Sequence, residues 1–182
     1  TALTLGWALY LCAFDPKVQE KLRAESQSVL NERTATYDDV TKMPYCEQVI
    51  KETLRLYPPA AFLSRTAQDA DTLCGRNIKP KDTVMLPVYA LHRNELLWDD
   101  PDTFDPDRFG KGADYDRFSW LPFGDGPRVC IGSHFAMIEA QIILSTLISR
   151  FKFERIPDKD PKPVLVVTLR PEGGVPLKVT PV

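Results

Sequence analysis

One segment of the 182-residue sequence combines residue types that could do chemistry. It reads Phe123-Gly-Asp-Gly-Pro-Arg-Val-Cys-Ile-Gly132, and an apolar stretch that predicts a buried helix follows it. A cysteine at a helix N-terminus meets unpaired N–H groups and the positive end of the helix dipole, which favour its thiolate. Arg128 adds a fixed positive charge suited to a carboxylate. Glycines at 124, 126 and 132 allow tight turns and close approaches. Cys130 is therefore a candidate thiolate.

The residues alone leave other interpretations of Cys130 open. A free cysteine is often a small apolar filler of the core. A nucleophilic cysteine needs a histidine as base and a third group to orient it; His134 is the nearest candidate, and no orienting group is evident. The other cysteines, Cys12, Cys46 and Cys74, are widely spaced, which disfavours a zinc site or a disulfide framework. Free thiols indicate a reducing compartment, and we expect the cytoplasm.

The segment resembles the heme-binding signature of the cytochromes P450, F-x-x-G-x-R-x-C-x-G. Its fixed positions are matched by Phe123, Gly126, Arg128, Cys130 and Gly132. Three further matches follow the family's order and spacing: Glu52-Thr-Leu-Arg55 for E-x-x-R, Pro106-Asp-Arg-Phe109 for P-E-R-F with Asp in place of Glu, and Arg65 at a basic position. The resemblance covers essentially the whole chain, but only the later part of the family's longer fold.

The resemblance implies a heme-thiolate monooxygenase that inserts one oxygen atom of O2 into a lipophilic substrate. Its cofactor would be heme b (iron protoporphyrin IX), with an axial thiolate from Cys130. Two electrons would come from a redox partner, a ferredoxin or a flavin reductase. Residues expected to bind the heme are Phe123, Gly126, Arg128, Gly132, Arg65 and His92, although His92 is equally well explained as a packing histidine. The backbone N–H groups of Ile131 and Gly132 would tune the sulfur.

The same resemblance implies a structural cluster of Glu52, Arg55 and Arg108. Helical periodicity alone would make Glu52 and Arg55 a solvated i,i+3 pair worth about 0.2–0.5 kcal/mol. In similar enzymes the three side chains are buried together. The substrate pocket is expected to include Ala60, Ala61, Phe62, Leu63, Val166, Val167 and Thr168, for each of which ordinary core packing is at least as good an explanation.

The elements that must position these residues are mainly helical. Apolar periodicity and capping signals predict helices over 1–14, 16–30, 45–57 and 131–151. Short β-type runs fall in 72–88, a long irregular but packed loop in 98–123, and a hairpin of 164–169 with 175–179 near the end. The expected fold is mainly α with minor β (α+β), in one unit over 1–182. Its heme-binding cysteine loop precedes a long buried helix.

Composition limits the class of partner. Net charge is −2 and no long basic run is present, so nucleic acid is not expected to bind. The apolar stretch at 1–14 is shorter than the ~20 residues that span a bilayer and does not resemble a signal peptide.

The N-terminus departs from the family pattern. Similar enzymes carry A-G-x-[DE]-T-T, and Thr1 would be its second threonine, so the oxygen-activating threonine is expected to precede Thr1. We therefore assign no catalytic residue. We expect an incomplete fragment that binds heme poorly and does not turn over alone. A membrane anchor before Thr1 stays open, as does a non-catalytic heme-binding module as the alternative function.

Overall fold

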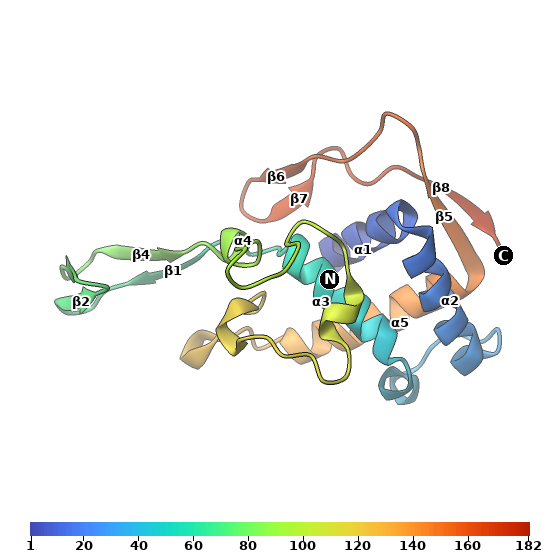
Figure 1. The fold of residues 1–182 in the computed structure, drawn as a ribbon, viewed down its shortest axis with the longest axis horizontal. Helices are drawn as coiled ribbons and strands as arrows, with labels where there is room; N and C mark the ends of the chain where they lie inside the picture. Colours follow the sequence, from blue (N-terminus) through green and yellow to red (C-terminus); the bar gives the residue numbers. More distant parts are fainter.

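Four helices form the main core of the protein in a computed structural model that describes residues 1–182. They are α1 (Ala2–Phe14), α2 (Pro16–Leu30), α3 (Pro44–Leu56) and α5 (Ser133–Arg150), and Figure 1 shows them gathered at one end of an elongated molecule. The shared core includes buried Cys12, Leu22, Val49, Leu144 and Ile148. The four predicted helices are confirmed, with ends shifted by one or two residues. None of them is long and apolar enough to cross a membrane.

Local capping explains where two of these helices begin. The Asp15 carboxylate accepts hydrogen bonds from the backbone N–H groups of Lys17 and Val18, and Pro16 occupies the first position of α2. At the start of α3, the carboxylate of Glu25 in α2 accepts from the N–H groups of Tyr45 and Cys46, each at 2.8 Å. The α3 N-terminus is therefore capped by the neighbouring helix, which fixes α2 against α3.

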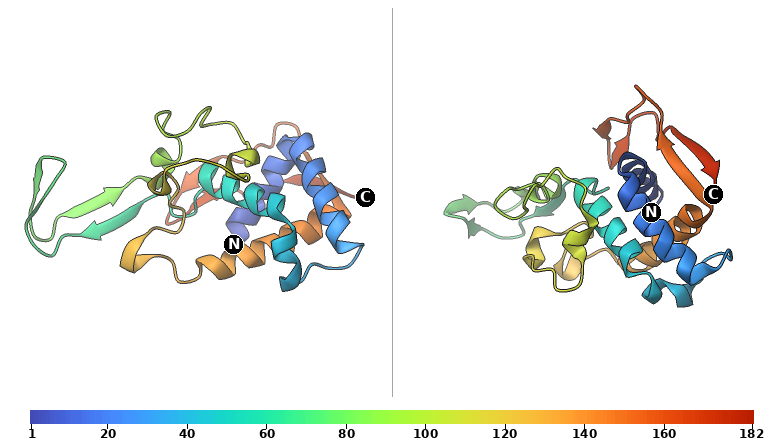
Figure 2. Two further views of the ribbon diagram at one scale, coloured as in Figure 1. Left: turned by 60° about the horizontal axis from the view of Figure 1, so that its bottom comes forward. Right: turned by 45° about the vertical axis from the view of Figure 1, so that its right-hand side comes forward.

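The strands form four small antiparallel pairs. Strand β1 (Leu63–Thr66) pairs with β4 (Thr83–Leu86), and β2 (Asp71–Leu73) pairs with β3 (Arg76–Ile78). These four strands form a long extension that projects from the helical part, which Figures 1 and 2 show from three sides. The short helix α4 (Val88–Leu91) follows β4. The β-type runs predicted between 72 and 88 are thus confirmed, although β1 was not anticipated.

The predicted C-terminal hairpin is wrong. Strand β6 (Pro163–Leu165) pairs with β7 (Leu169–Pro171), whereas β8 (Leu177–Pro181) pairs with β5 (Phe151–Arg155), directly after α5. The buried Phe153 side chain holds β5 against the core, and Gln19 of α2 bonds both the N–H and the C=O of Phe153. With β5 held in place, its free edge can pair with β8 at the C-terminal end of the chain. The alternation of Phe151 and Phe153 with charged residues was the signal for this strand.

A buried ion pair connects α3 to the irregular segment that precedes the cysteine loop. Glu52 and Arg55 are both fully buried, with Arg55 Nε 2.7 Å from Glu52 Oε2. Burial contradicts the solvated pair that periodicity predicts, because the segment 92–109 covers this side of the helix. The structure brings Arg108 to the same place, with its Nε 3.3 Å from Glu52 Oε1.

All five N–H donors of Arg55 find an acceptor in this cluster. Nε and Nη2 donate to Glu52, and the remaining donors reach backbone carbonyls. These are His92 O at 2.8 Å, Pro101 O at 2.6 Å and Thr103 O at 3.0 Å. Glu52 also accepts from the N–H of Asp105 at 3.0 Å. One buried pair thus holds four points of a segment that has little regular structure of its own.

We predict that Glu52→Gln lowers the free energy of unfolding by about 3–5 kcal/mol, because it leaves a buried guanidinium without its counter-charge. Glu47→Gln is the matched control: Glu47 pairs with Lys51 at 2.7 Å on the same helix, but both side chains are partly exposed. This variant should lose no more than about 0.5 kcal/mol. Urea denaturation followed by circular dichroism measures both. Equal losses in the two variants would contradict the prediction.

Candidate functional site

The four cysteines occupy different environments. Cys12 and Cys46 are buried; burial raises the pKa of Cys12 to about 12 and that of Cys46 well above its usual range, so both remain thiols. Cys74 is exposed in the turn between β2 and β3. Cys130 is exposed too, and it lines a cavity. Of the four cysteines, Cys130 is the one that is exposed and also lines this cavity.

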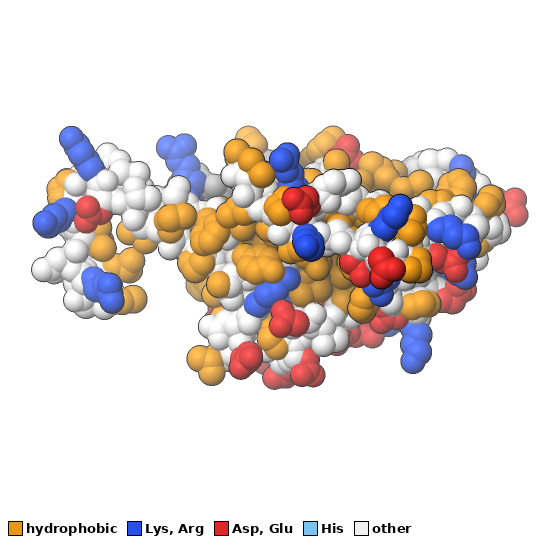
Figure 3. Space-filling view, turned by 90° about the horizontal axis from the view of Figure 1, so that it is seen from above, with side chains coloured by type: hydrophobic (Ala, Val, Ile, Leu, Met, Phe, Trp, Pro, Cys, Tyr) orange, Lys and Arg blue, Asp and Glu red, His pale blue; other side chains and the backbone are white.

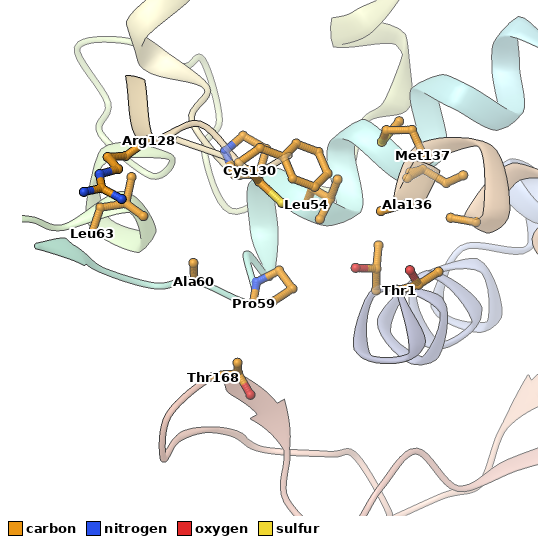
Figure 4. A pocket seen from close by; sticks show the side chains of 15 residues that line it. Thr1, Leu54, Pro59, Ala60, Leu63, Arg128, Cys130, Ala136, Met137 and Thr168 are labelled. Atoms are coloured by element: carbon orange, nitrogen blue, oxygen red, sulfur yellow. The ribbon is translucent and has the colours of Figure 1, made fainter. Parts of the chain in front are cut away.

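The cavity has a volume of about 400 Å³ and a mostly apolar lining. Figure 4 shows the Cys130 sulfur facing the open space, with Pro59, Ala60 and Thr168 across from it and Thr1 to one side. The lining comes from α1 and the residue before it, α3, α5, the start of β1, the cysteine loop and two connecting segments. Its members are Thr1, Thr4, Ile50, Leu54, Pro59, Ala60, Leu63, Pro122, Phe123, Arg128, Cys130, Ala136, Met137, Ala140 and Thr168.

Backbone geometry explains how the cysteine loop closes. Gly124 and Gly126 have φ angles of 73° and 74°, in the left-handed region that favours glycine. The N–H of Cys130 donates to the carbonyl of Phe123 at 2.9 Å. The Asp125 carboxylate accepts a hydrogen bond from the N–H of Gly126 at 2.6 Å. This bond is the main cause that lowers the pKa of the Asp125 carboxyl, and the positive charge of Arg117 adds to it. The loop therefore presents Cys130 in a fixed turn.

Gly132 differs from Gly124 and Gly126, because neither its backbone conformation nor the space around it requires glycine. Its φ is −89°, which any residue can adopt, and a Cβ built on it would lie 4.0 Å from the Cys130 sulfur. Gly132 is the residue before the first turn of α5, so the backbone at the start of this helix lies beside the sulfur. The N–H groups of Ile131 and Gly132 donate to no other group in the chain.

Arg128 is the cation of this site. It lines the cavity, and it forms no ion pair within the chain, whereas Arg117 is paired with Asp125 at 2.7 Å. An unpaired guanidinium at an apolar cavity suits a ligand that is largely apolar and carries a carboxylate. A heme has this character, with an apolar macrocycle, propionate groups and an iron that takes a thiolate ligand. The residues present fit that group.

Other predicted site residues lie elsewhere. His92 is fully buried, and both ring nitrogens contact backbone groups, as its packing interpretation requires. Arg65 is exposed on β1 outside the cavity, and its Nη1 donates to the carbonyl of Ser64. Of the predicted substrate pocket, Ala60, Leu63 and Thr168 line the cavity, whereas Ala61, Phe62, Val166 and Val167 do not.

The alternative of a nucleophilic cysteine gains no support from the geometry. His134 is exposed on the first turn of α5, and no hydrogen bond joins it to Cys130. The sequence reasoning also missed several lining residues, among them Thr4, Leu54 and Met137. Apolar residues three and four positions away in the sequence predict that they are core residues. The packing of α1, α3 and α5 shows instead that they face a cavity.

Comparison with known proteins identifies the family. The sequence model described as Cytochrome P450 matches residues 1–178. Among similar proteins are mouse (Mus musculus) "Cytochrome P450 4A12B", 37% identical over 97% of the chain, and "Cyclooctatin synthase" of Streptomyces melanosporofaciens, 38% identical over 97%. "Cytokinin hydroxylase" of Arabidopsis thaliana is 39% identical over 100% of the chain. The chain spans 35%, 39% and 35% of these relatives, respectively. The match of the family model over nearly every residue shows that this chain belongs to the cytochrome P450 family.

Proposed function

We propose that these residues form the heme-binding part of a heme-thiolate monooxygenase that oxidises a lipophilic small molecule. The observation that carries the proposal is the position of Cys130. Its sulfur faces an apolar cavity of about 400 Å³, beside two unpaired backbone N–H groups and an unpaired arginine. Cys130 would be the axial ligand of a heme b.

Each group at the site has a role in this proposal. The N–H groups of Ile131 and Gly132 and the dipole of α5 stabilise the negative charge on the sulfur. Arg128 would pair with a propionate, and Phe123 would pack against the ring. When bound, the heme supplies the activation of O2, which electron donation from the thiolate assists. Ala60, Leu63 and Thr168 would exclude water from an apolar substrate held in the cavity.

We further propose that a longer protein completes the site. The relatives are longer than this chain, and their additional residues would cover apolar side chains that are exposed here, including Ile131 and Phe135. Figure 3 shows hydrophobic side chains gathered in the middle of one face. The complete protein would receive two electrons from a ferredoxin or a flavin reductase. Its free thiols fit a reducing compartment such as the cytoplasm.

The ligand role of Cys130 is tested by Cys130→His in the natural protein that contains these residues. Imidazole can still bind heme iron, so we expect heme to be retained while the thiolate-type Soret band of the reduced, CO-bound form is lost. Cys74→Ser, at the other exposed cysteine, should leave that band unchanged. A thiolate-type band that survives in Cys130→His would overturn the assignment.

The substrate side of the cavity is tested by Thr168→Phe. The larger side chain takes up cavity volume, so 4-phenylimidazole should bind the heme at least tenfold more weakly while the smaller imidazole binds as before. Spectral titration measures both ligands. Val167→Phe is the matched control, because Val167 is exposed and lies outside the lining. A similar loss in both variants would count against this pocket.

The need for further residues is tested on the 182-residue chain by itself. We expect it to bind hemin at least tenfold more weakly than the natural protein does. It should also give no product with O2, NADPH and an added reductase. Absorbance titration and product analysis measure the two properties. Robust hydroxylation by the isolated chain would refute the proposal that other residues complete the site.

A further inference from the structure

The His92 side chain makes two hydrogen bonds in the core. Its Nδ1 lies 3.1 Å from the carbonyl oxygen of Arg55, and the N–H of Leu121 donates to its Nε2 at 2.8 Å. Since a backbone N–H can only donate, Nε2 must be the unprotonated nitrogen. Nδ1 therefore carries the proton and donates it to the Arg55 carbonyl. The two bonds define one tautomer of a neutral imidazole.

The Arg55 end of this bridge is fixed from two directions. While the His92 ring donates to the Arg55 carbonyl, Arg55 Nη1 donates to the His92 carbonyl at 2.8 Å. Arg55 is itself held by the fully buried carboxylate of Glu52. His92 is thus attached, through both its backbone and its side chain, to an α3 residue that is fully buried and has all its side-chain donors bonded.

The Leu121 end leads to the cysteine loop. The carbonyl of Leu121 accepts from the N–H of Gly124 at 3.1 Å, and the carbonyl of Phe123 accepts from the N–H of Cys130 at 2.9 Å. Leu121 begins the turn that contains Phe123. The imidazole therefore holds the start of the same short turn that holds the Cys130 backbone.

We infer that His92 is a positioning residue for Cys130: through its Nε2 it fixes the Leu121–Gly124 turn, and with it the cysteine, to the buried Glu52–Arg55 pair. This inference rests on the proposed function and adds a residue that lies outside the cavity. His92 touches neither the cavity nor Cys130, so it acts through the turn.

Charge and burial favour the tautomer that the bridge needs. Burial lowers the pKa of His92 to about 4, and the guanidiniums of Arg55 and Arg93 oppose a further positive charge nearby. The backbone carbonyls of Arg55 and Leu54 act in the opposite direction. The ring is neutral near pH 7, where Nε2 remains an acceptor for the Leu121 N–H.

Two conservative substitutions test the bond to Leu121 separately from the bond to Arg55. Gln places an amide oxygen near the position of Nε2, so His92→Gln keeps an acceptor for Leu121. Asn places its amide near Nδ1, so His92→Asn keeps the contact with Arg55 and loses the one with Leu121. Trp120→Phe is the control for general loosening, because it removes a different bond between this segment and α3, from Trp120 Nε1 to the carbonyl of Lys51 at 3.2 Å.

The test uses the natural heme-loaded protein that contains these residues. In the reduced, CO-bound form, we expect the thiolate-type Soret band of His92→Asn to convert to the thiol type on the order of tenfold faster than that of wild type. His92→Gln and Trp120→Phe should stay within about twofold of wild type. Hydrogen exchange of the Leu121, Phe123 and Gly124 amides, followed by mass spectrometry, should accelerate in His92→Asn alone.

Equal behaviour of the Gln and Asn variants, or the same acceleration in Trp120→Phe, would overturn the inference while leaving the proposed function intact. A wild-type protein with no thiolate-type band would instead overturn the proposed function, and the inference with it. If His92→Asn binds too little heme for the spectrum, the exchange rates of the heme-free variants decide between the outcomes.

Discussion

The buried pair of Glu52 and Arg55 is the constraint on which the site's surroundings depend. Two opposite charges removed from water are stable only when their remaining donors and acceptors are also satisfied. Here all five Arg55 donors are used, and three of them end on backbone carbonyls between His92 and Thr103. The backbone carbonyls that complete the hydrogen bonds of Arg55 therefore also set the position of the irregular segment.

That requirement explains how a cysteine loop with little secondary structure can hold a defined geometry. The residues between Trp98 and Phe123 include only short 3-10 turns, so their backbone groups cannot rely on a helix or a sheet for partners. They bond instead to α3 through Arg55, Glu52 and the Trp120 indole, and to the His92 ring. Positive φ angles at Gly124 and Gly126 then turn the chain toward Cys130.

The cysteines illustrate how surroundings, rather than residue type, decide chemistry. Cys12 and Cys46 lie among apolar side chains that disfavour the thiolate. Cys130 lies outside the core, at the end of α5 where backbone N–H groups are unpaired. Cys74 is also exposed, but it lies in the turn between β2 and β3 and does not line the cavity of Cys130. The resemblance of the motif and the geometry of the cavity both support the proposal that Cys130 is the ligand.

The sequence by itself determined the family motif around Cys130, the four helices and the mixed α+β class, because these depend on local spacing, caps and periodicity. It also marked Glu52, Arg55 and Arg108 through resemblance, although periodicity placed the first two in solvent. Only the tertiary structure decided that this pair is buried, that β8 pairs with β5, and that Thr168 shares a cavity with Cys130. It also showed that His92 bonds Leu121. Each of these depends on contacts between residues more than 20 apart in the chain. Such contacts leave no periodic trace in the sequence, since the segment that covers a helix face is decided by the packing of the whole chain.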